Sequence, residues 1–482
     1  MKKEKKDFDA IVVGSGPNGL AAAITIQQQG LSVLLIEGKD QIGGGMRTAE
    51  LTLPGFKHDV CSAIHPMAAG SPFFKTLPLH EFGLEWIYPP VAAAHPLDNG
   101  EAAILTHHIF DTAEQLGSDA AAYKNLIGPI LKNWPAFVKD LLAPLHFPGK
   151  PFAMAGFGLK GLQSAKLLSR TFKTEKAKAL FAGMAAHSIL PLDKMASAAI
   201  GLVLMTAAHA DGWPIPGGGS QSLANALADY FVSIGGQIET GNMISSLYQL
   251  PSSRAVLLDV TPRQLLKIAG QKFSTIYRSQ LSRYRYGMGV FKIDWALDSP
   301  IPFTAKDCSK AGTVHIGGTW NEIAHSEQQS WKGIHSRKPF VLLAQQSVFD
   351  KTRAPSGKHT AWAYCHVPSG SDKNMTDIIE QQVERFAPGF RDLISGRHTM
   401  NSKELEQYNP NYIGGDINGG AAIISQLFTR PALRYSPYRT SAKGIYVCSS
   451  STPPGGGVHG MNGWHAAKRA LKDIFKINLP PV

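Results

Sequence analysis

The chain has 482 residues, of which 44% are hydrophobic and 17% charged, so composition excludes a disordered protein and the length indicates more than one domain. The net charge is +12, but Lys and Arg are spread along the chain and no nucleic-acid-binding motif is present. We therefore expect no nucleic-acid partner and favour a solvated basic surface, with weak peripheral contact to anionic lipid headgroups as the alternative.

Cysteine usage narrows the chemistry further. The four cysteines include no CxxC pair and are Cys61, Cys308, Cys365 and Cys448. This scatter argues against a disulfide framework, a zinc site or a dithiol redox centre, so no metal is expected. The basic N-terminus runs into a strand without the long apolar stretch of an export signal, which favours a cytoplasmic protein.

The first forty residues carry a strand, turn, helix, strand pattern. Asp9–Val13 predict a short buried strand, Leu20–Ile24 the start of a small-residue helix, and Ser32–Ile36 a second strand that ends at Glu37. The turn between the first strand and the helix fits GxGxxG and consists of Gly14, Ser15, Gly16, Pro17, Asn18 and Gly19. Because the turn follows a strand, opens a helix and precedes an acidic residue, it predicts a dinucleotide site.

Each position in this pattern has a physical role. Gly14 permits the tight turn, Gly16 lets the backbone approach a pyrophosphate, and Gly19 lets helix and strand pack closely. Pro17 and Asn18 lie at the helix N-terminus, whose partial positive charge favours phosphate groups. A carboxylate at the second strand end accepts hydrogen bonds from a ribose diol and repels a 2′-phosphate, so NADP is disfavoured.

A second glycine loop follows in Ile42–Thr48. Gly44 and Gly45 would let this backbone approach the other side of a pyrophosphate, and Arg47 would supply a charge-assisted contact. The alternative is an ordinary glycine turn with a solvated arginine. These residues do not by themselves separate FAD from NAD, because both contain an ADP half.

The combined pattern resembles the phytoene-dehydrogenase-like flavoproteins, which are relatives of carotenoid desaturases and of pyridine nucleotide-disulphide oxidoreductase domain-containing protein 2 within the broader amine-oxidase-like superfamily. The resemblance extends over nearly the whole chain. Its segments are GSGPNG, GGGMRT, GFKHDVCSAIHP (55–66), PIPGGGSQSLANAL (214–227), FKIDWALDSPIPF (291–303), YNPNYIGGDINGG (408–420) and GIYVCSSSTPPGGGVHGMNGWHAA (444–467).

The resemblance implies an FAD site with two ends. The tail would place the backbone of Val458, Gly460 and Met461 against the flavin half, and Ile244 would pair with the adenine. The tail is expected to form a strand at Ile445–Cys448, then a Gly/Pro loop, then a helix from about Gly463. From 444 to 467 it has no Asp, Glu, Lys or Arg, yet Pro453, Pro454 and Gly455–Gly457 rule out one regular helix or strand, so buried partners are needed for its polar backbone. Two departures from carotenoid desaturases, Cys61 and the Ser449–Ser451 run containing Ser450, would lie near the flavin.

The resemblance also implies the architecture. The fold class is α/β, with a Rossmann-like FAD-binding domain and a mixed, partly helical substrate domain. We expect a discontinuous FAD-binding domain from residues 1–75, 211–275 and 436–482, and a substrate domain from 76–210 and 276–435. Residues 110–210 are expected to be mainly helical, with a break near Pro148 and Pro151.

The expected function is that of an FAD-dependent dehydrogenase or desaturase acting on a hydrophobic small molecule. A flavin accepts the hydride, so no protein nucleophile is required. His65 and His459 are the candidate catalytic residues, with histidines bonded to loop backbone as the alternative. A flavin amine oxidase on the same fold and a flavin-stabilised interaction protein stay open. Only one dinucleotide fingerprint is present, so oxygen, a quinone or another protein are the alternatives for the electron acceptor.

Overall fold

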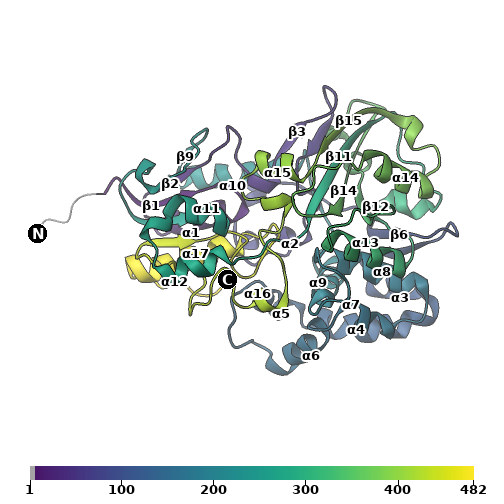
Figure 1. Ribbon diagram of the computed structural model, residues 1–482, viewed down its shortest axis with the longest axis horizontal. Helices are drawn as coiled ribbons and strands as arrows, with labels where there is room; N and C mark the ends of the chain where they lie inside the picture. The colour runs from purple at the N-terminus through teal and green to yellow at the C-terminus, as the bar shows by residue number, and fades with distance from the viewer. Residues whose placement is uncertain (1–5) are drawn as a thin grey trace, which may run out of the picture.

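The computed structural model describes residues 6–482, so the first five residues of the predicted segment 1–75 lie outside the described part. Figure 1 shows two regions side by side, one built on a five-stranded sheet and the other on a seven-stranded sheet with a layer of helices below it. Among residues 6–482, no helix combines the length and the apolar character that crossing a membrane requires.

The five-stranded sheet is assembled from segments far apart in the chain. Its order is β16-β10-β1-β2-β9 and every neighbouring pair is parallel. The strands are β1 (Phe8–Val13), β2 (Val33–Ile36), β9 (Gln237–Glu239), β10 (Ser253–Leu258) and β16 (Ile445–Val447). They come from the three segments expected to form one domain, whose outer boundaries stay a prediction.

Helices cover both faces of this sheet. Ala10 and Val12 of β1 pack into the core with α1 (Pro17–Gln27), α10 (Ser220–Ser233) and α17 (Met461–Ala470). Ile11 and Val13 point the other way, into the core with α11 (Pro262–Ala269) and α12 (Thr275–Ser282). Since alternate residues of a strand face opposite sides, a fully apolar strand such as VLLI in β2 is what a sheet buried on both faces requires.

The second sheet is mixed and has the order β15-β11-β14-β13-β12-β6-β7. Its strands are β6 (Val91–Pro96), β7 (Ala102–Leu105), β11 (Gly289–Leu297), β12 (Ala311–Ile316), β13 (Val341–Ala344), β14 (His359–Val367) and β15 (Ile394–Met400). The β12–β6 pair is parallel and the others are antiparallel. Helices α13 (Trp320–Trp331), α14 (Thr376–Phe386) and α15 (Ser402–Tyr408) accompany it.

Residues 109–210 form the helical layer that the apolar spacing predicts. It contains α3 (Ile109–Gln115), α4 (Ala120–Lys132), α5 (Trp134–Leu141), α6 (Pro151–Gly161), α7 (Ala165–Leu168), α8 (Glu175–Ala186) and α9 (Ser197–Ala210). The predicted break is present, because no helix spans 142–150. Short elements complete the fold: β3 (Thr48–Glu50) with β4 (Lys57–Asp59), β5 (Trp86–Ile87) with β8 (Ile215–Pro216), α2 (Pro66–Ala69) and α16 (Ile424–Leu427).

Candidate functional site

A cavity of about 560 Å³ opens between the two sheets. Twelve of the sequence-predicted site residues line it: Gly14, Gly16, Pro17, Asn18, Glu37, Gly44, Gly45, Arg47, His65, Ile244, Ser450 and Val458. The others, Gly19, His459, Gly460 and Met461, lie outside its lining. One end, here called the glycine end, is formed by the two glycine loops and the carboxyl ends of β1, β2 and β10. The opposite end, under the seven-stranded sheet, is here called the apolar end.

The turn at the glycine end has the geometry that its sequence predicts. Gly14 adopts φ +99°, in the region that favours glycine. A Cβ at Gly19 would lie 1.8 Å from the carbonyl oxygen of Gly14, so only glycine allows α1 to approach β1 this closely. Gly16 is the N-cap of α1 and has no side chain of its own to cap the helix, so the N–H of Gly19 in the first turn is accepted by Asp259 instead, and the backbone at Gly16 stays open to the approach of an anionic group.

Glu37 is held by groups from both glycine loops. Its Oε2 accepts hydrogen bonds from the backbone N–H (3.0 Å) and hydroxyl (2.6 Å) of Ser15, and its Oε1 accepts one from the N–H of Lys39 (2.9 Å). The Arg47 guanidinium pairs with Oε1 at 3.0 Å and also donates through Nε to the carbonyl of Gln41 (2.8 Å). Arg47 therefore secures the acidic residue and the second loop together, a role that differs from the expected reach to a pyrophosphate.

The two glycine loops touch one another. A Cβ at Gly44 would lie 2.8 Å from the Cα of Gly16, and Gly43 N–H donates to the carbonyl of Ser15 at 3.1 Å. Contact this close between two backbones leaves room for a ligand beside them only because neither glycine carries a side chain.

Asp259, at the end of β10, is a site residue that the sequence analysis did not single out. Its Oδ2 accepts the N–H of Gly19 at 3.0 Å, and it lines the cavity beside the glycine turn. Burial, aided by the negative charge of Glu37, raises the pKa of Asp259 to about 7, against the bond from Gly19, which lowers it. Its position after a strand could have identified it, because the carboxyl ends of parallel strands lie at the same edge of a sheet, next to the glycine turn.

The C-terminal segment packs directly against the N-terminal helix. A Cβ at Gly463 of α17 would lie 1.8 Å from the carbonyl oxygen of Asn18, and one at Gly460 would lie 2.9 Å from the Cβ of Ala21. Ser71 also donates to the carbonyl of His459 at 2.7 Å. Residues more than four hundred positions apart therefore form one wall, and Val458 and Ser450 extend it into the cavity.

The two predicted catalytic histidines differ in placement. His459 accepts the N–H of Met461 through Nδ1 at 3.1 Å, at the start of α17 and outside the cavity lining. Burial lowers its pKa to about 4. The geometry thus matches the backbone-bonding alternative, and Gly460 and Met461 shape the wall from behind it.

His65 does line the cavity, and its hydrogen bonds define its tautomer. The Ser220 hydroxyl donates to the carbonyl of Ser62 at 2.6 Å, so it accepts a hydrogen bond from Nε2 of His65 at 2.8 Å. Nδ1 then carries a lone pair and has no partner within the described residues. Burial lowers the pKa of His65 to about 4, so the ring is neutral near pH 7.

The apolar end is lined by large side chains from helices and from the seven-stranded sheet. They are Met67, Leu204, Trp213, Leu342, Trp362 and Tyr364. Trp213 is fixed by a hydrogen bond from its indole N–H to the hydroxyl of Thr313 at 2.8 Å. The rings of Trp362 and Tyr364, on β14, meet edge to face with centroids 5.2 Å apart. Within the described residues, the acidic side chains of the cavity lining are Glu37 and Asp259, both at the glycine end.

The apolar end also contributes an imidazole, the side chain of His187. It lines the cavity, and its Nε2 forms a 3.0 Å hydrogen bond with Nε2 of His315 on β12. Burial lowers the pKa of His187 to about 3 and that of His315 well below its ordinary value, so the pair is neutral and shares one proton between the bonded nitrogens. Its neighbours on α8 are apolar, so the local sequence gives no signal that separates His187 from a core residue. No local motif marks its partner on β12.

The cavity fits an extended dinucleotide on two grounds. The buried Asn18 lines it with an amide oxygen that has no partner in the described residues, and buried polar atoms normally have one. The glycine loops let phosphates approach the start of α1 closely, beside Asp259, while the remaining space leads to the apolar end. Among residues 6–482, no group of three or more His, Cys, Asp or Glu side chains could hold a metal ion.

Comparisons with known proteins agree with this geometry. Residues 12–77 match the family model of the NAD(P)-binding Rossmann-like domain. The chain is 25% identical to rat (Rattus norvegicus) pyridine nucleotide-disulfide oxidoreductase domain-containing protein 2, with 98% of this chain and 94% of that protein covered. It is 22% identical to one of the subunits of the limonene dehydrogenase of Castellaniella defragrans, with 98% and 96% covered.

Solved structures show the same fold. An oxidoreductase from Methanosarcina mazei superposes with a TM-score of 0.65 at 16% identity, covering 96% of this chain and all of that one. Putrescine oxidase bound to putrescine superposes with a TM-score of 0.62 at 16% identity, covering 98% and 99%.

The fold, the two-ended cavity and the sequence similarity to named oxidoreductases define an oxidoreductase built on a Rossmann-like dinucleotide domain. Within that class the predicted resemblance to the phytoene-dehydrogenase-like oxidoreductases is confirmed by sequence similarity along nearly the whole chain. The predicted α/β fold class is confirmed as well.

Proposed function

We propose that the chain binds FAD along the cavity and oxidises a hydrophobic small molecule held at the apolar end. The observation that carries the proposal is the continuity of the cavity, which joins the glycine loops to a tryptophan-rich and tyrosine-containing wall without an intervening layer of protein. The full-length similarity to a limonene dehydrogenase, whose name specifies a hydrocarbon substrate, supports the same substrate class.

The residues at the glycine end would bind the nucleotide half. The start of α1 would receive the pyrophosphate, while Glu37, held in place by Ser15 and Arg47, disfavours a 2′-phosphate. Ser450 and Val458 would contact the other half from the C-terminal segment. When bound, FAD supplies the acceptor for a hydride.

The chain's own contribution at the apolar end is to exclude water, orient the substrate and hold a proton. Trp213, Trp362 and Leu204 provide apolar surface, and the bond from Trp213 to Thr313 fixes one of these rings. His187 and His65 are the neutral imidazoles in the lining. His65 offers the lone pair on Nδ1, and the bond between the Nε2 atoms of His187 and His315 holds the His187 ring in the lining.

The proposal is tested by reconstitution and anaerobic reduction. Purified protein supplied with FAD is expected to retain about one flavin per chain after gel filtration, and a panel of terpenes, polyenes and long-chain alcohols is then screened for bleaching of the flavin absorbance. Protein that stays colourless after FAD is supplied contradicts cofactor binding. Protein that binds FAD but is reduced only by polar substrates contradicts the substrate class.

A flavin amine oxidase is the second candidate, favoured by the superposition on putrescine oxidase. The edge-to-face Trp362 and Tyr364 could contact an amine through their aromatic faces. However, the described lining has no carboxylate at the apolar end to pair with a charged amine. The test is a panel of amines with oxygen as the electron acceptor. If the protein releases hydrogen peroxide with these amines, the amine oxidase proposal replaces the leading one.

A further inference from the structure

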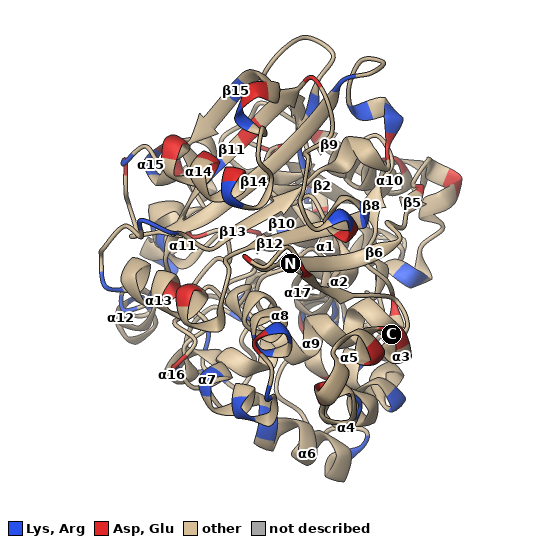
Figure 2. Ribbon diagram, turned by 90° about the vertical axis from the view of Figure 1, so that its right-hand side faces the viewer, with Lys and Arg blue, Asp and Glu red and all other residues tan. Residues whose placement is uncertain are grey.

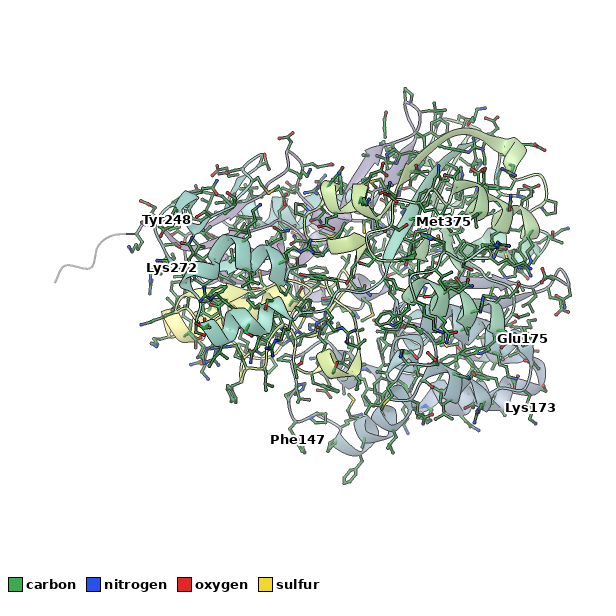
Figure 3. All side chains as sticks on the ribbon, in the orientation of Figure 1. Phe147, Lys173, Glu175, Tyr248, Lys272 and Met375 are labelled. Atoms are coloured by element: carbon green, nitrogen blue, oxygen red, sulfur yellow. The ribbon has the colours of Figure 1, made fainter. Side chains whose placement is uncertain are left out.

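Helix α6 and the loop before it expose a group of large apolar side chains. Leu145 and Phe147 in the loop are 82% and 83% exposed, and Phe152 and Leu159 on the helix are 93% and 74% exposed. We refer to these four side chains as the α6 surface. Figure 1 places α6 at the lower edge of the molecule, and Figure 3 marks Phe147 there. Single exposed apolar residues are common, but a group this exposed indicates an interaction site.

The helix itself is unusual because both of its faces are apolar. Its inner face packs into the helical layer, where the rings of Phe157 and Phe137 meet with centroids 5.9 Å apart. Its outer face carries Phe152, Ala155, Gly156 and Leu159, at the three- and four-residue spacing of one side of a helix. A helix on the surface of a soluble domain normally turns polar residues outward, and Lys160 is the one charged residue of α6.

The charged side chains of the loop, of α6 and of the start of α7 are basic, because residues 141–166 contain no Asp or Glu and include Lys150, Lys160 and Lys166. The neighbouring acidic group is Asp140, whose carboxylate bonds His146 and the N–H of Gly149 in the loop. Figure 2 shows α6 as a tan ribbon at the lower edge. Exposed apolar side chains with basic residues around them are complementary to the interface of an anionic bilayer, where rings and aliphatic chains enter the headgroup boundary and lysines contact the headgroups.

The surface also adjoins the helix that forms one wall of the cavity. A Cβ at Gly161 of α6 would lie 3.5 Å from the Cβ of Ala199 on α9, and α9 carries Leu204 of the apolar end. One layer of helix therefore separates the α6 surface from the part of the cavity assigned to a hydrophobic substrate.

We propose that the α6 surface docks this protein on an anionic lipid bilayer, with Phe147, Phe152 and Leu159 entering the interface and Lys150, Lys160 and Lys166 contacting headgroups. Docking there brings α9 and the apolar end towards the medium in which a hydrophobic substrate concentrates. The docking goes beyond the proposed oxidoreductase activity and can be measured without any substrate.

The experiment is vesicle sedimentation with the full chain in three forms besides the wild type. The apolar variant carries Phe147→Ser, Phe152→Ser and Leu159→Ser, and the charge variant carries Lys150→Glu, Lys160→Glu and Lys166→Glu. The matched control carries Tyr248→Ser and Ile276→Ser, which remove side chains of similar exposure (81% and 75%). Figure 3 shows Tyr248 at the left-hand end of the molecule, away from Phe147 at the lower edge. Vesicles of phosphatidylcholine alone are compared with vesicles containing equal phosphatidylglycerol.

The wild type and the control are expected to sediment with the anionic vesicles, less with neutral ones, and less again at high salt. Both surface variants should bind at least tenfold more weakly, since each lysine near an anionic surface contributes roughly fivefold. Wild-type protein that stays in the supernatant, or a control that loses binding equally, overturns the proposal. Conversion of a dimer to a monomer by the apolar variant, with vesicle binding unchanged, assigns the surface to a second copy and also overturns it.

Two further measurements separate a loss of docking from misfolding and from loss of flavin. If the apolar variant fails to fold, the charge variant decides, because its three substitutions replace exposed or half-buried lysines. FAD content measured in the same preparations separates a failure of docking from a failure of the flavin proposal.

Discussion

The two ends of the cavity are built in different ways. The glycine end is made mainly by contiguous runs of sequence, with a turn, a helix start and a strand end within residues 9–48. The apolar end is assembled from single residues of separate elements, such as Leu204 of α9, Leu342 of β13 and Trp362 of β14. A site that binds its ligand through the backbone needs glycines at fixed spacing, and these form a recognisable sequence motif. A site that binds its ligand through apolar side chains can take those side chains from any part of the fold, so it has no sequence motif.

The largest expected effect comes from breaking the junction that joins the ends of the chain. Gly463→Val would place a side chain where a Cβ already lies 1.8 Å from the carbonyl oxygen of Asn18. We expect a loss of more than about 4 kcal/mol in the free energy of unfolding and loss of bound flavin. Gly128→Ala is the control, because its Cβ would meet nothing within 4 Å. Denaturant unfolding and flavin content measure both, and a Gly463→Val protein with wild-type stability contradicts this packing.

The second prediction concerns how the stability of the protein depends on pH through Asp259 at the glycine end. Because the pKa of Asp259 is raised from 3.8 to about 7 by burial, the folded protein holds a proton between pH 4 and 7 that the unfolded chain has lost. Stability therefore falls as pH rises through this window. Asp259→Asn keeps an acceptor for the N–H of Gly19 and should raise the free energy of unfolding at pH 8 by about 4 kcal/mol.

At pH 4 the same variant and the wild type should have similar stability, which provides an internal control. Thermal or denaturant unfolding across pH 4–8 measures the effect. A difference between the two proteins that does not change with pH would show that Asp259 is not the titrating group.

The third prediction separates the two ends functionally. His187→Asn removes an imidazole from the apolar end and should lower the rate of flavin reduction by the best substrate of the panel about a hundredfold, with flavin content unchanged. His209→Asn is the matched control, since His209 also lies in the helical layer and bonds the Tyr123 hydroxyl at 2.7 Å, outside the cavity lining. Equal rate losses in both variants would point to a general packing effect.

The same contrast explains how far the sequence could predict the molecule. The parallel strands and the start of α1 follow from local apolar runs, and β1 and β16 lie within one or two residues of the expected ranges. The partnership of Arg47 with Glu37 could not be read from spacing, because a guanidinium ten residues away can reach either a phosphate or a carboxylate.

The sequence predicted a site for a hydrophobic substrate, but it did not predict which residues form the apolar end. His187 and His315 are 128 positions apart, and their hydrogen bond depends on how α8 packs under β12. Nothing in the apolar run of α8 distinguishes a histidine that packs in the core from one that lines a cavity. The resemblance places Gly460 and Met461 at the flavin half, which stays a prediction, and His459 accepts the N–H of Met461 where the chain enters α17.

The central claim is tested most directly by an experimental structure of the protein reconstituted with FAD. We expect one extended dinucleotide, with its pyrophosphate at the start of α1, its other half beside Val458, and open space from there to Trp362. Density for FAD anywhere else, or a C-terminal segment that does not contact α1, would contradict it.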